Sequence, residues 1–469
     1  MELSARLMLA VSTLLPSPAA SETLRQALER AYRTNPVLTA ARAGLRATDE
    51  GVPLAKAAAR PAVSATADYQ EFVARSTNSL VSPLRAANAG ATASLPLYQG
   101  GGVRAAIRAA DARVLAGRAG LRSTEADVFT AVVAAYMDVI RDDAIVRLNR
   151  ANVALLQTNV RASRDRFEVG DLTLTDVAQS EARLALGESQ LETAEAQLDA
   201  SRENYLRFVG VAPVDLQPPP PLPDLPASAS QAVGIAVQNN PSLLAATEQA
   251  RAAGYDIGVA KATRLPRLAL VGSSNYNNYL GTLGSNVPGR VFQQVQQTAT
   301  LGVSLSLPLY QGGAPGARVR QAQALASQAL EQIVTVERGV VADAGAAFSR
   351  YKATQGVIRS AVVAVRANEL ALEGTRAENG VGTRTVLEVL NAQQELLNSR
   401  VQLVTAERDA YVAGFALRAA MGRAEARDLG LFGDNIYDFT LNYTQPRSAG
   451  IPERSPFKDV PPALPSQPE

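Results

Sequence analysis

Apolar residues recur every seven positions along two long segments of the chain, at about 102–168 and 314–380. The first series is Ile107, Val114, Leu121 and Val128, then, after a step of eleven, Val139, Val146, Val153, Val160 and Phe167. The second series keeps Val319, Ile333, Val340, Ile358, Val365 and Leu372. Heptads of this kind predict coiled-coil helices, and the longer step predicts a local unwinding of the supercoil. Each helix of about 65 residues would be close to ~100 Å long.

Each long helix is followed by a glycine and a second helical pattern. Gly170 and Gly382 mark the turns, and the partner helices are predicted at about 172–209 and 384–422. Because a glycine accepts the left-handed conformation of a tight turn, we expect each pair to fold as an antiparallel hairpin.

A second periodicity, of two residues, predicts strands. Within 298–310, Leu301, Val303, Leu305, Leu307 and Leu309 alternate with small or polar residues. A weaker version occupies 89–97, and two preceding strands are expected to begin at Pro61 and Pro266. Periodicity alone also fits a half-buried strand in a soluble sheet. Four strands among so much helix would make a poor soluble sheet, whereas strands of about ten residues suit an outer-membrane barrel.

Four strands cannot close a barrel, since a barrel needs at least about eight. Open sheet edges are not tolerated in lipid. A membrane location therefore predicts an oligomer, with eight strands from two chains or twelve from three, and the pattern does not choose between them.

The chain contains the same plan twice. The sequence of Leu95–Gly101 is repeated without change at Leu307–Gly313. The six-residue spacing from Gly170 to Asp176 is repeated from Gly382 to Glu388. We predict two structural repeats of the order short helix, strand, strand, long helix and helix. The predicted boundaries are 20–209 and 228–422, with short helices at 21–58 and 228–263, a Pro-rich linker at 210–227, and a C-terminal segment at 423–469 whose tail is disordered from about Gln445.

Composition excludes most catalytic chemistry. The chain has no His, Cys or Trp, which removes the usual zinc, haem and thiol sites and any Ser-His-Asp triad. We therefore predict no enzyme activity, no cofactor and no metal site. The formal net charge is +2 and no Lys/Arg-rich block is present, which argues against a nucleic-acid partner. Residues 1–19 resemble a secretory signal peptide, and no apolar stretch of about 20 residues predicts a transmembrane helix.

The chain resembles the outer-membrane factor family, the TolC-like exit ducts of bacterial efflux pumps and type I secretion systems. The resemblance rests on the duplicated helix-strand-strand-helix plan, on the two Leu-Tyr-Gln-Gly-Gly segments, and on the run from Val381 to Glu395. It implies a homotrimer in the cell outer membrane, with a 12-stranded β-barrel continued by a 12-helix periplasmic α-barrel. The implied partners are outer-membrane lipid, a periplasmic adaptor (membrane fusion) protein and, through the adaptor, an inner-membrane RND or ABC transporter.

The same resemblance implies roles for the two helical hairpin turns. The adaptor would dock on Val169, Gly170, Asp171, Val381, Gly382 and Thr383. A gate at the periplasmic aperture would involve Thr175, Asp176, Asn379, Arg384, Glu388 and Asn391. In it, Arg384 would pair with Asp176 as a latch and Glu388 would make the duct cation-selective. Asn379 stands where the family has a tyrosine and Asn391 where it has a carboxylate, so three ring carboxylates are expected in place of six.

The function expected from the sequence is a passive exit duct, gated at its hairpin end. The alternative is a soluble periplasmic coiled-coil scaffold or adaptor protein, which would explain the heptads equally well but not the strands or the signal. Nothing in the sequence indicates the cargo or the particular transporter that the duct serves.

Overall fold

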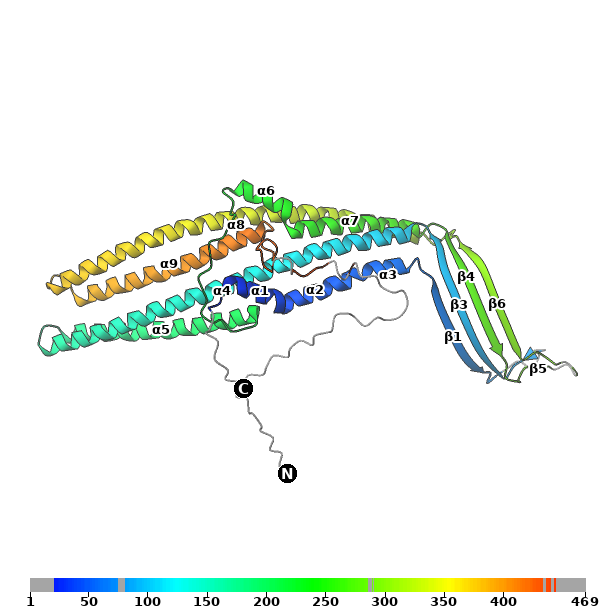
Figure 1. Ribbon diagram of the computed structural model, residues 1–469, viewed down its shortest axis with the longest axis horizontal. Coiled ribbons are helices and arrows are strands. Elements are labelled where there is room, and N and C mark those ends of the chain that lie inside the picture. The colour runs from blue at the N-terminus through cyan, green and yellow to red at the C-terminus, as the bar shows by residue number, and fades with distance from the viewer. Residues whose placement is uncertain are drawn as a thin grey trace, which may run out of the picture.

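The computed structural model describes residues 21–74, 81–285, 289, 291–432, 436–439 and 443. The predicted signal peptide at 1–19 and the tail predicted to be disordered from Gln445 lie outside this described part. The molecule is elongated, with a β-sheet at one end, two helical hairpin turns at the other end, and shorter helices beside the middle (Figure 1).

Two helices of 67 residues each run along the length of the molecule (Figure 1). They are α4 (Gly102–Glu168) and α8 (Ala314–Gly380), at the predicted positions. The return helices α5 (Leu174–Val209) and α9 (Val386–Ala420) begin two residues later than predicted, because a threonine caps each first turn. Within the described parts of the chain, every helix falls short of the length and apolarity that a membrane crossing requires.

The prediction of one short helix in each repeat is wrong in detail. The first is three helices, α1 (Leu24–Thr34), α2 (Pro36–Asp49) and α3 (Gly51–Ala57). The second is two, α6 (Ala229–Asn239) and α7 (Pro241–Ala262).

The helix breaks at Asn35 and Asn240 have one cause. Both residues adopt an extended conformation and each is followed by a proline at the first helical position. A proline has no N–H to continue the preceding helix, and the asparagine side chain accepts a hydrogen bond from the backbone two residues on, at 2.9 Å in both repeats. Each pair therefore ends one helix and begins the next.

Four antiparallel strands form the sheet, in the order β1-β3-β4-β6. They are β1 (Ala62–Glu71), β3 (Arg85–Gln99), β4 (Arg267–Asn278) and β6 (Val295–Ser306). Beyond them, β2 (Val81–Ser82) pairs with β5 (Gly284–Ser285). The prediction that the last strand continues to Tyr310 is wrong, because its partner β4 begins at Arg267, opposite Ser306, and leaves the following residues without a ladder.

The register of the sheet separates apolar from polar side chains. Directly paired residues lie on the same face, so Leu95, Leu270 and Val303 share one face in a single row across three strands. The opposite face carries small and polar residues, which hydrogen-bond across strands: Ser64 with Thr92 at 2.7 Å, and Ser273 with Thr300 at 2.7 Å. The predicted alternation is thus confirmed along the described strands.

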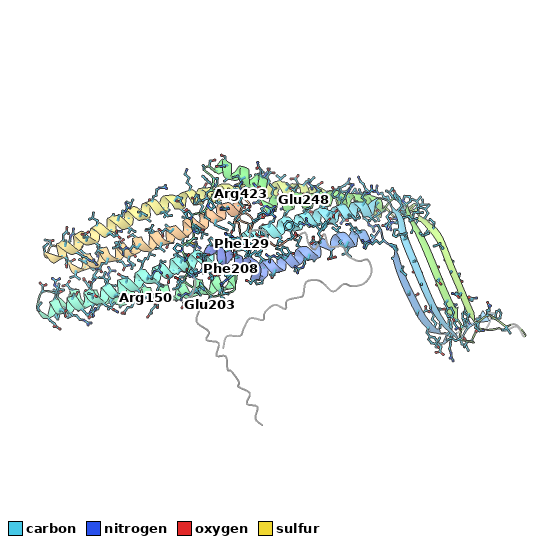
Figure 2. All side chains as sticks on the ribbon, viewed as in Figure 1. Phe129, Arg150, Glu203, Phe208, Glu248 and Arg423 are labelled. Carbon is cyan, nitrogen blue, oxygen red and sulfur yellow. The ribbon has the colours of Figure 1, made fainter. Side chains whose placement is uncertain are left out.

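The largest buried core lies in the middle of the molecule, where α1, α4, α5 and α9 meet. Phe129 is fully buried there and Phe208 packs against the cluster (Figure 2). Tyr136, also fully buried, donates its hydroxyl toward the carbonyl oxygens of Glu22 at 2.9 Å and Gln217 at 2.6 Å. The N-terminal segment and the linker are therefore both fastened to α4.

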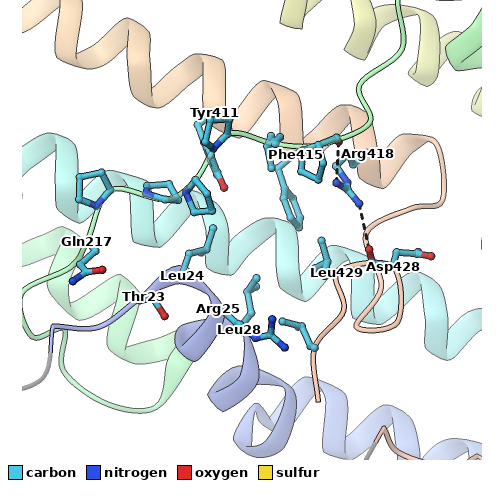
Figure 3. Close-up of a pocket in the computed structure, with 17 residues that line it drawn as sticks. Thr23, Leu24, Arg25, Leu28, Gln217, Tyr411, Phe415, Arg418, Asp428 and Leu429 are labelled. Atoms are coloured by element: carbon cyan, nitrogen blue, oxygen red, sulfur yellow. Dashed lines mark hydrogen bonds between the residues drawn. The ribbon is translucent and has the colours of Figure 1, made fainter. Parts of the chain in front are cut away.

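The linker and the segment after α9 pack on this core. Arg418 donates to the carbonyl oxygen of Pro223 at 3.0 Å and is buried beside the 424–431 segment (Figure 3). Around it lies a cavity of about 450 Å³, lined by the prolines 218–221, by α1 and α9, and by Leu429. Its lining is mainly apolar, so we assign it to the packing of the linker.

Candidate functional site

The two helical hairpin turns lie at the end of the molecule opposite the sheet (Figure 1). They contain all six residues predicted to dock an adaptor: Val169, Gly170, Asp171, Val381, Gly382 and Thr383. The Val169 side chain is 80% exposed and the Val381 side chain 76%. Each turn therefore presents an uncovered apolar side chain at the tip of the molecule.

Both turns are Schellman motifs built around a glycine. Gly170 and Gly382 have φ of +80°, in the left-handed region that a residue with a Cβ adopts only with strain. The Asp171 N–H donates to the Arg166 carbonyl at 2.9 Å, and the Thr383 N–H donates to the Glu378 carbonyl at 3.0 Å. No atom lies within 4 Å of a Cβ built on either glycine, so the backbone conformation, not crowding, requires glycine here.

The predicted gate carboxylates Asp176 and Glu388 close capping boxes at the starts of α5 and α9. The Asp176 carboxylate accepts from the Thr173 N–H at 3.0 Å, and the Asp176 N–H donates to the Thr173 hydroxyl at 3.3 Å. Glu388 and Thr385 make the same pair of bonds at 2.8 and 3.3 Å. The repeated spacing from glycine to acid thus corresponds to one turn followed by one capped helix.

Hydrogen bonding stabilises both carboxylates in their ionised form. The Thr173 hydroxyl and N–H lower the pKa of Asp176. The Thr385 N–H, the Arg384 guanidinium and the Thr385 hydroxyl together lower the pKa of Glu388 to about 2. Both groups are therefore charged throughout the physiological pH range.

Arg384 is paired within its own hairpin. Its guanidinium contacts Glu378 at 2.7 Å and Glu388 at 2.7 Å, bridging the end of α8 to the start of α9. The contact between Arg384 and Asp176 that the resemblance implies is absent from the described residues of the protomer. The first hairpin has a different pair across its turn, Arg166 with Asp171 at 2.6 Å.

The remaining gate candidates differ in their surroundings. The Asn379 side chain donates to the Arg384 carbonyl at 2.7 Å, which fixes the turn. Thr175 is exposed and makes no side-chain hydrogen bond within the described part of the chain. Asn391 accepts a hydrogen bond from Arg183 on α5. Two residues further along α9, Gln393 accepts from Asn159 on α4 at 3.0 Å.

These last two bonds connect the hairpin of the first repeat to that of the second. Arg183, Asn159, Thr173, Thr385 and Glu378 were not predicted from the sequence. The signal that could have found the two threonines is the spacing Thr-x-x-Asp and Thr-x-x-Glu, the signature of a capping box. No local signal marks Arg183 or Asn159, because their partners lie more than 200 positions away.

The polar side chains near the hairpin tips form ion pairs, helix caps and hydrogen bonds that hold the turns in shape. Among the described residues, no group of three or more acidic side chains is placed to hold a metal ion. Near the turns, Arg166 pairs with Asp171 and Arg384 with Glu378 and Glu388. Single hydrogen bonds join the two hairpins near the tips, from Arg183 to Asn391 and from Asn159 to Gln393, whereas nearer the core Arg408 on α9 forms an ion pair with Asp138 on α4 at 2.8 Å. Such an arrangement can hold the hairpins together near the core while their tips separate at small energetic cost.

Comparison with known proteins adds sequence and fold similarity. The sequence profile of the family described as outer membrane efflux protein matches residues 27–211 and 232–423. The outer membrane efflux protein BepC of Brucella suis biovar 1 (strain 1330) is 35% identical over 431 residues, covering 92% of each chain. The outer membrane protein TolC of Vibrio cholerae serotype O1 is 28% identical over 427 residues, covering 88% of this chain and 94% of that one. The solved outer-membrane channel OprN has the same fold, with a TM-score of 0.71 at 23% identity over 85% of this chain and 89% of that one.

Proposed function

This chain belongs to the outer membrane efflux protein family, and from that premise we propose that three copies assemble into a gated duct that spans the outer membrane and the adjoining periplasm. It is an outer-membrane exit channel of efflux or secretion systems. The family consists of channel proteins, and we propose that this chain likewise catalyses no reaction.

The observation that carries the proposal is the sheet with two unlike faces and two open edges. Among the described residues, β1 pairs only with β3 and β6 only with β4, so the backbone groups on the outer sides of β1 and β6 have no partner strand in that part of the protomer. In lipid such edges must pair. Pairing β1 of each copy with β6 of the next closes a barrel, and three copies of four strands give twelve.

Aromatic side chains support a membrane position for the apolar face. Tyr276 and Tyr69 lie near the far end of the strands, while Tyr98, opposite Leu268, lies near the helices. The eight steps along the strand from Leu268 to Tyr276 span about 27 Å at ~3.4 Å per residue. Outer-membrane barrels have an apolar band of about 25 Å between two aromatic girdles. The spacing of the tyrosines thus agrees with that band.

We propose that residues 20–209 and 228–422 are the two structural repeats of the duct, with 210–227 as the linker and 423–469 as a periplasmic C-terminal segment. The order of elements supports the division, because each part contains short helices, two strands of the main sheet, a helix of 67 residues and a return helix. Two similar hairpins per chain then contribute twelve helices to a trimeric tunnel.

The hairpin tips are the proposed docking site for a periplasmic adaptor protein, through which the duct would serve an inner-membrane RND or ABC transporter. The exposed Val169 and Val381, each beside a glycine turn, support this assignment, since an uncovered apolar side chain at a rigid tip suits a protein contact.

The proposed gate comprises Thr175, Asp176, Asn379, Arg384, Glu388 and Asn391, and Glu388 would give the aperture its preference for cations. Because Arg384 pairs with Glu378 and Glu388 in the protomer, we assign the latch to those pairs and to the bond from Arg183 to Asn391. Exposed ion pairs are worth about 0.2–1 kcal/mol each, so three copies bias the closed state modestly and a docked adaptor can offset that bias.

The proposal is tested by conductance of the detergent-extracted protein in planar bilayers. We expect small, long-lived, cation-selective openings from the wild type, larger openings from Arg384→Ala, and weaker cation selectivity from Glu388→Gln. A protein that stays soluble without detergent and gives no conductance would instead support the periplasmic scaffold.

Assembly is tested by cross-linking between the open sheet edges. The chain has no Cys, so introduced cysteines are the only thiols. Ser64→Cys on β1, combined in turn with Thr298→Cys, Thr300→Cys or Gly302→Cys on β6, should yield a covalent trimer on oxidation for at least one pair. The matched control places the first cysteine at Thr92 on the central strand β3, where no intermolecular bond should form.

A further inference from the structure

A row of polar side chains crosses the whole sheet near its far end. The register aligns Asp68 on β1 with Asn88 on β3, Asn277 on β4 and Gln296 on β6. The Asn88 amide donates to the Asp68 carboxylate at 2.7 Å. One carboxylate and three amides therefore lie at one level on the polar face.

Charge on the polar face is sparse. The four long strands carry four charged residues among those the structure describes: Asp68, Glu71, Arg85 and Arg267. Glu71 and Arg85 are paired directly in the register, 3.9 Å apart, on the face opposite Asp68. Arg267 shares the polar face with Asp68 but begins β4, ten positions before Asn277 and so about 34 Å away at ~3.4 Å per residue. Such a distance exceeds the Debye length of about 8 Å at physiological salt, so among the charges of the described strands Asp68 sets the sign of the field on the polar face at this level.

We propose that the row Asp68, Asn88, Asn277 and Gln296 forms a cation-binding girdle at the outer mouth of the duct, with Asp68 as the charged ligand. The inference rests on the proposed function, because the polar face lines the pore only if the sheets of several copies close into a barrel. Three copies then place three carboxylates and nine amides in a single ring, far from Glu388 at the hairpin tips.

The side chains of the row match the chemistry of a hard cation. Carboxylate and amide oxygens are the ligands that Mg²⁺ and Ca²⁺ take in proteins, and acidic rings select cations in channels. The Asn277 side-chain oxygen is buried and accepts no hydrogen bond from any residue that the structure describes, so an acceptor is left over in the row. A cation supplies the partner that this oxygen lacks.

The neighbouring row leaves room beside the girdle. Gly90 lies between Thr66 and Asn275 in the register, and a Cβ at Gly90 would stand 3.0 Å from the Asn275 side-chain oxygen and 3.3 Å from the Thr66 hydroxyl. The absence of a side chain at position 90 lets both oxygens reach toward the middle of the sheet. The level next to the girdle is therefore also lined by oxygen.

The decisive measurement is the reversal potential of single channels in a KCl gradient. We expect Asp68→Asn to lower the K⁺/Cl⁻ permeability ratio roughly twofold or more, because a ring of charge at a pore mouth concentrates its counter-ion. Glu71→Gln is the matched control, an acid of the same strand on the opposite face, and should leave the ratio unchanged. Asp68→Glu should retain the wild-type ratio.

A second readout uses the divalent cation itself. MgCl₂ added to one side of the bilayer should reduce the K⁺ conductance of the wild type and of Glu71→Gln, with a stronger effect from one side than from the other. In Asp68→Asn this side-specific block should disappear. A block of equal strength in Asp68→Asn would overturn the proposal.

Failure of the girdle and failure of the duct give different results. Thr66→Cys and Ala67→Cys are neighbours on opposite faces, and a charged thiol reagent should change the conductance of Thr66→Cys only. If the conductance of Thr66→Cys changes and Asp68→Asn keeps the wild-type selectivity, the proposal of a duct is supported and the proposal of a cation-binding girdle is wrong. If the wild type forms no channels, the proposed function itself fails.

Discussion

Arg183 on α5 donates a hydrogen bond to the Asn391 side chain on α9, joining the first helical hairpin to the second near their tips. Residues 208 positions apart in the chain thus meet where the two hairpins run side by side. Together with the bond from Asn159 to Gln393, this contact fixes the position of one hairpin against the other.

Removing the Arg183 contact should favour the open duct. The pair is exposed, so its loss costs about 0.5 kcal/mol per copy, and three copies shift the ratio of open to closed channels by roughly tenfold. Single-channel recordings of Arg183→Ala measure that ratio. Arg164→Ala is the control, since Arg164 pairs with Glu181 inside the first hairpin at 2.6 Å and should leave the ratio unchanged.

Loss of a capping threonine should loosen one hairpin locally. Thr385→Ala removes the hydroxyl that accepts from the Glu388 N–H and costs about 1 kcal/mol. Amide exchange in the first turn of α9, followed by mass spectrometry, should speed up about fivefold. Thr175→Ala, which removes an unbonded hydroxyl, should leave exchange in α5 as it is; equal acceleration in both variants would contradict the capping role.

The second hairpin should lose its cap only in strong acid. The pKa of Glu388 in the folded protein is about 2, below the ordinary value of 4.5, so its contribution to stability is complete above about pH 4.5 and is lost as the pH falls through 2. Exchange in the first turn of α9, measured from pH 5 down to pH 2, should rise in the wild type relative to the neighbouring turns. Glu388→Gln should show no such dependence on pH.

The Tyr136 hydroxyl should contribute to the free energy of unfolding in addition to the packing of the ring. Tyr136→Phe keeps the ring but removes the hydroxyl that donates to the Gln217 carbonyl at 2.6 Å, at a cost of about 1–3 kcal/mol. The Glu22 carbonyl keeps the Gln217 N–H as a donor at 3.0 Å. Chemical denaturation should detect the loss in the free energy of unfolding. Tyr411→Phe removes a hydroxyl that bonds to nothing in the described part of the chain, so a similar loss there would contradict the argument.

The segment after α9 should loosen as the pH rises through neutrality. Burial raises the pKa of Glu125, which accepts from the Ala426 N–H, to about 7. A raised pKa in an acid means that its stability contribution is complete below about pH 4.5 and declines as the pH rises through 7. Limited proteolysis of residues 424–431 should therefore accelerate between pH 6 and pH 8, and Glu125→Gln should abolish the change.

The long helices and the strands could be predicted from the local periodicity of apolar residues. Heptads from Ile107 to Phe167 mark α4 because seven residues are about two helical turns, so the apolar side chains fall on one face of the helix. The alternation at Leu301 and Val303 marks β6 because every second side chain of a strand lies on the same face. The helix breaks at Asn35 and Asn240 were missed although their Asn-Pro pairs carry a cap and a missing donor, both of which are local signals.

The candidate site was predictable only in its location. The glycines Gly170 and Gly382 mark the turns in the sequence. The ion-pair partners of Arg384, in contrast, depend on the side-chain conformations around the turn, which the sequence does not show. The resemblance pointed to Asp176, whereas Arg384 binds Glu378 and Glu388 in its own hairpin. Contacts such as Arg183 with Asn391 arise only when two distant segments pack together, and no pattern in either segment requires the other.

The acid and the base of the ion pair across the turn stand in opposite order in the two hairpins, although the backbone turn is the same. In the first, the base Arg166 ends the helix and the acid Asp171 stands in the turn, whereas in the second the acid Glu378 ends the helix and the base Arg384 follows the turn. The two tips therefore share one backbone turn but present acid and base in opposite order, so a partner protein can distinguish them, and a substitution at one tip can change recognition there without changing the other.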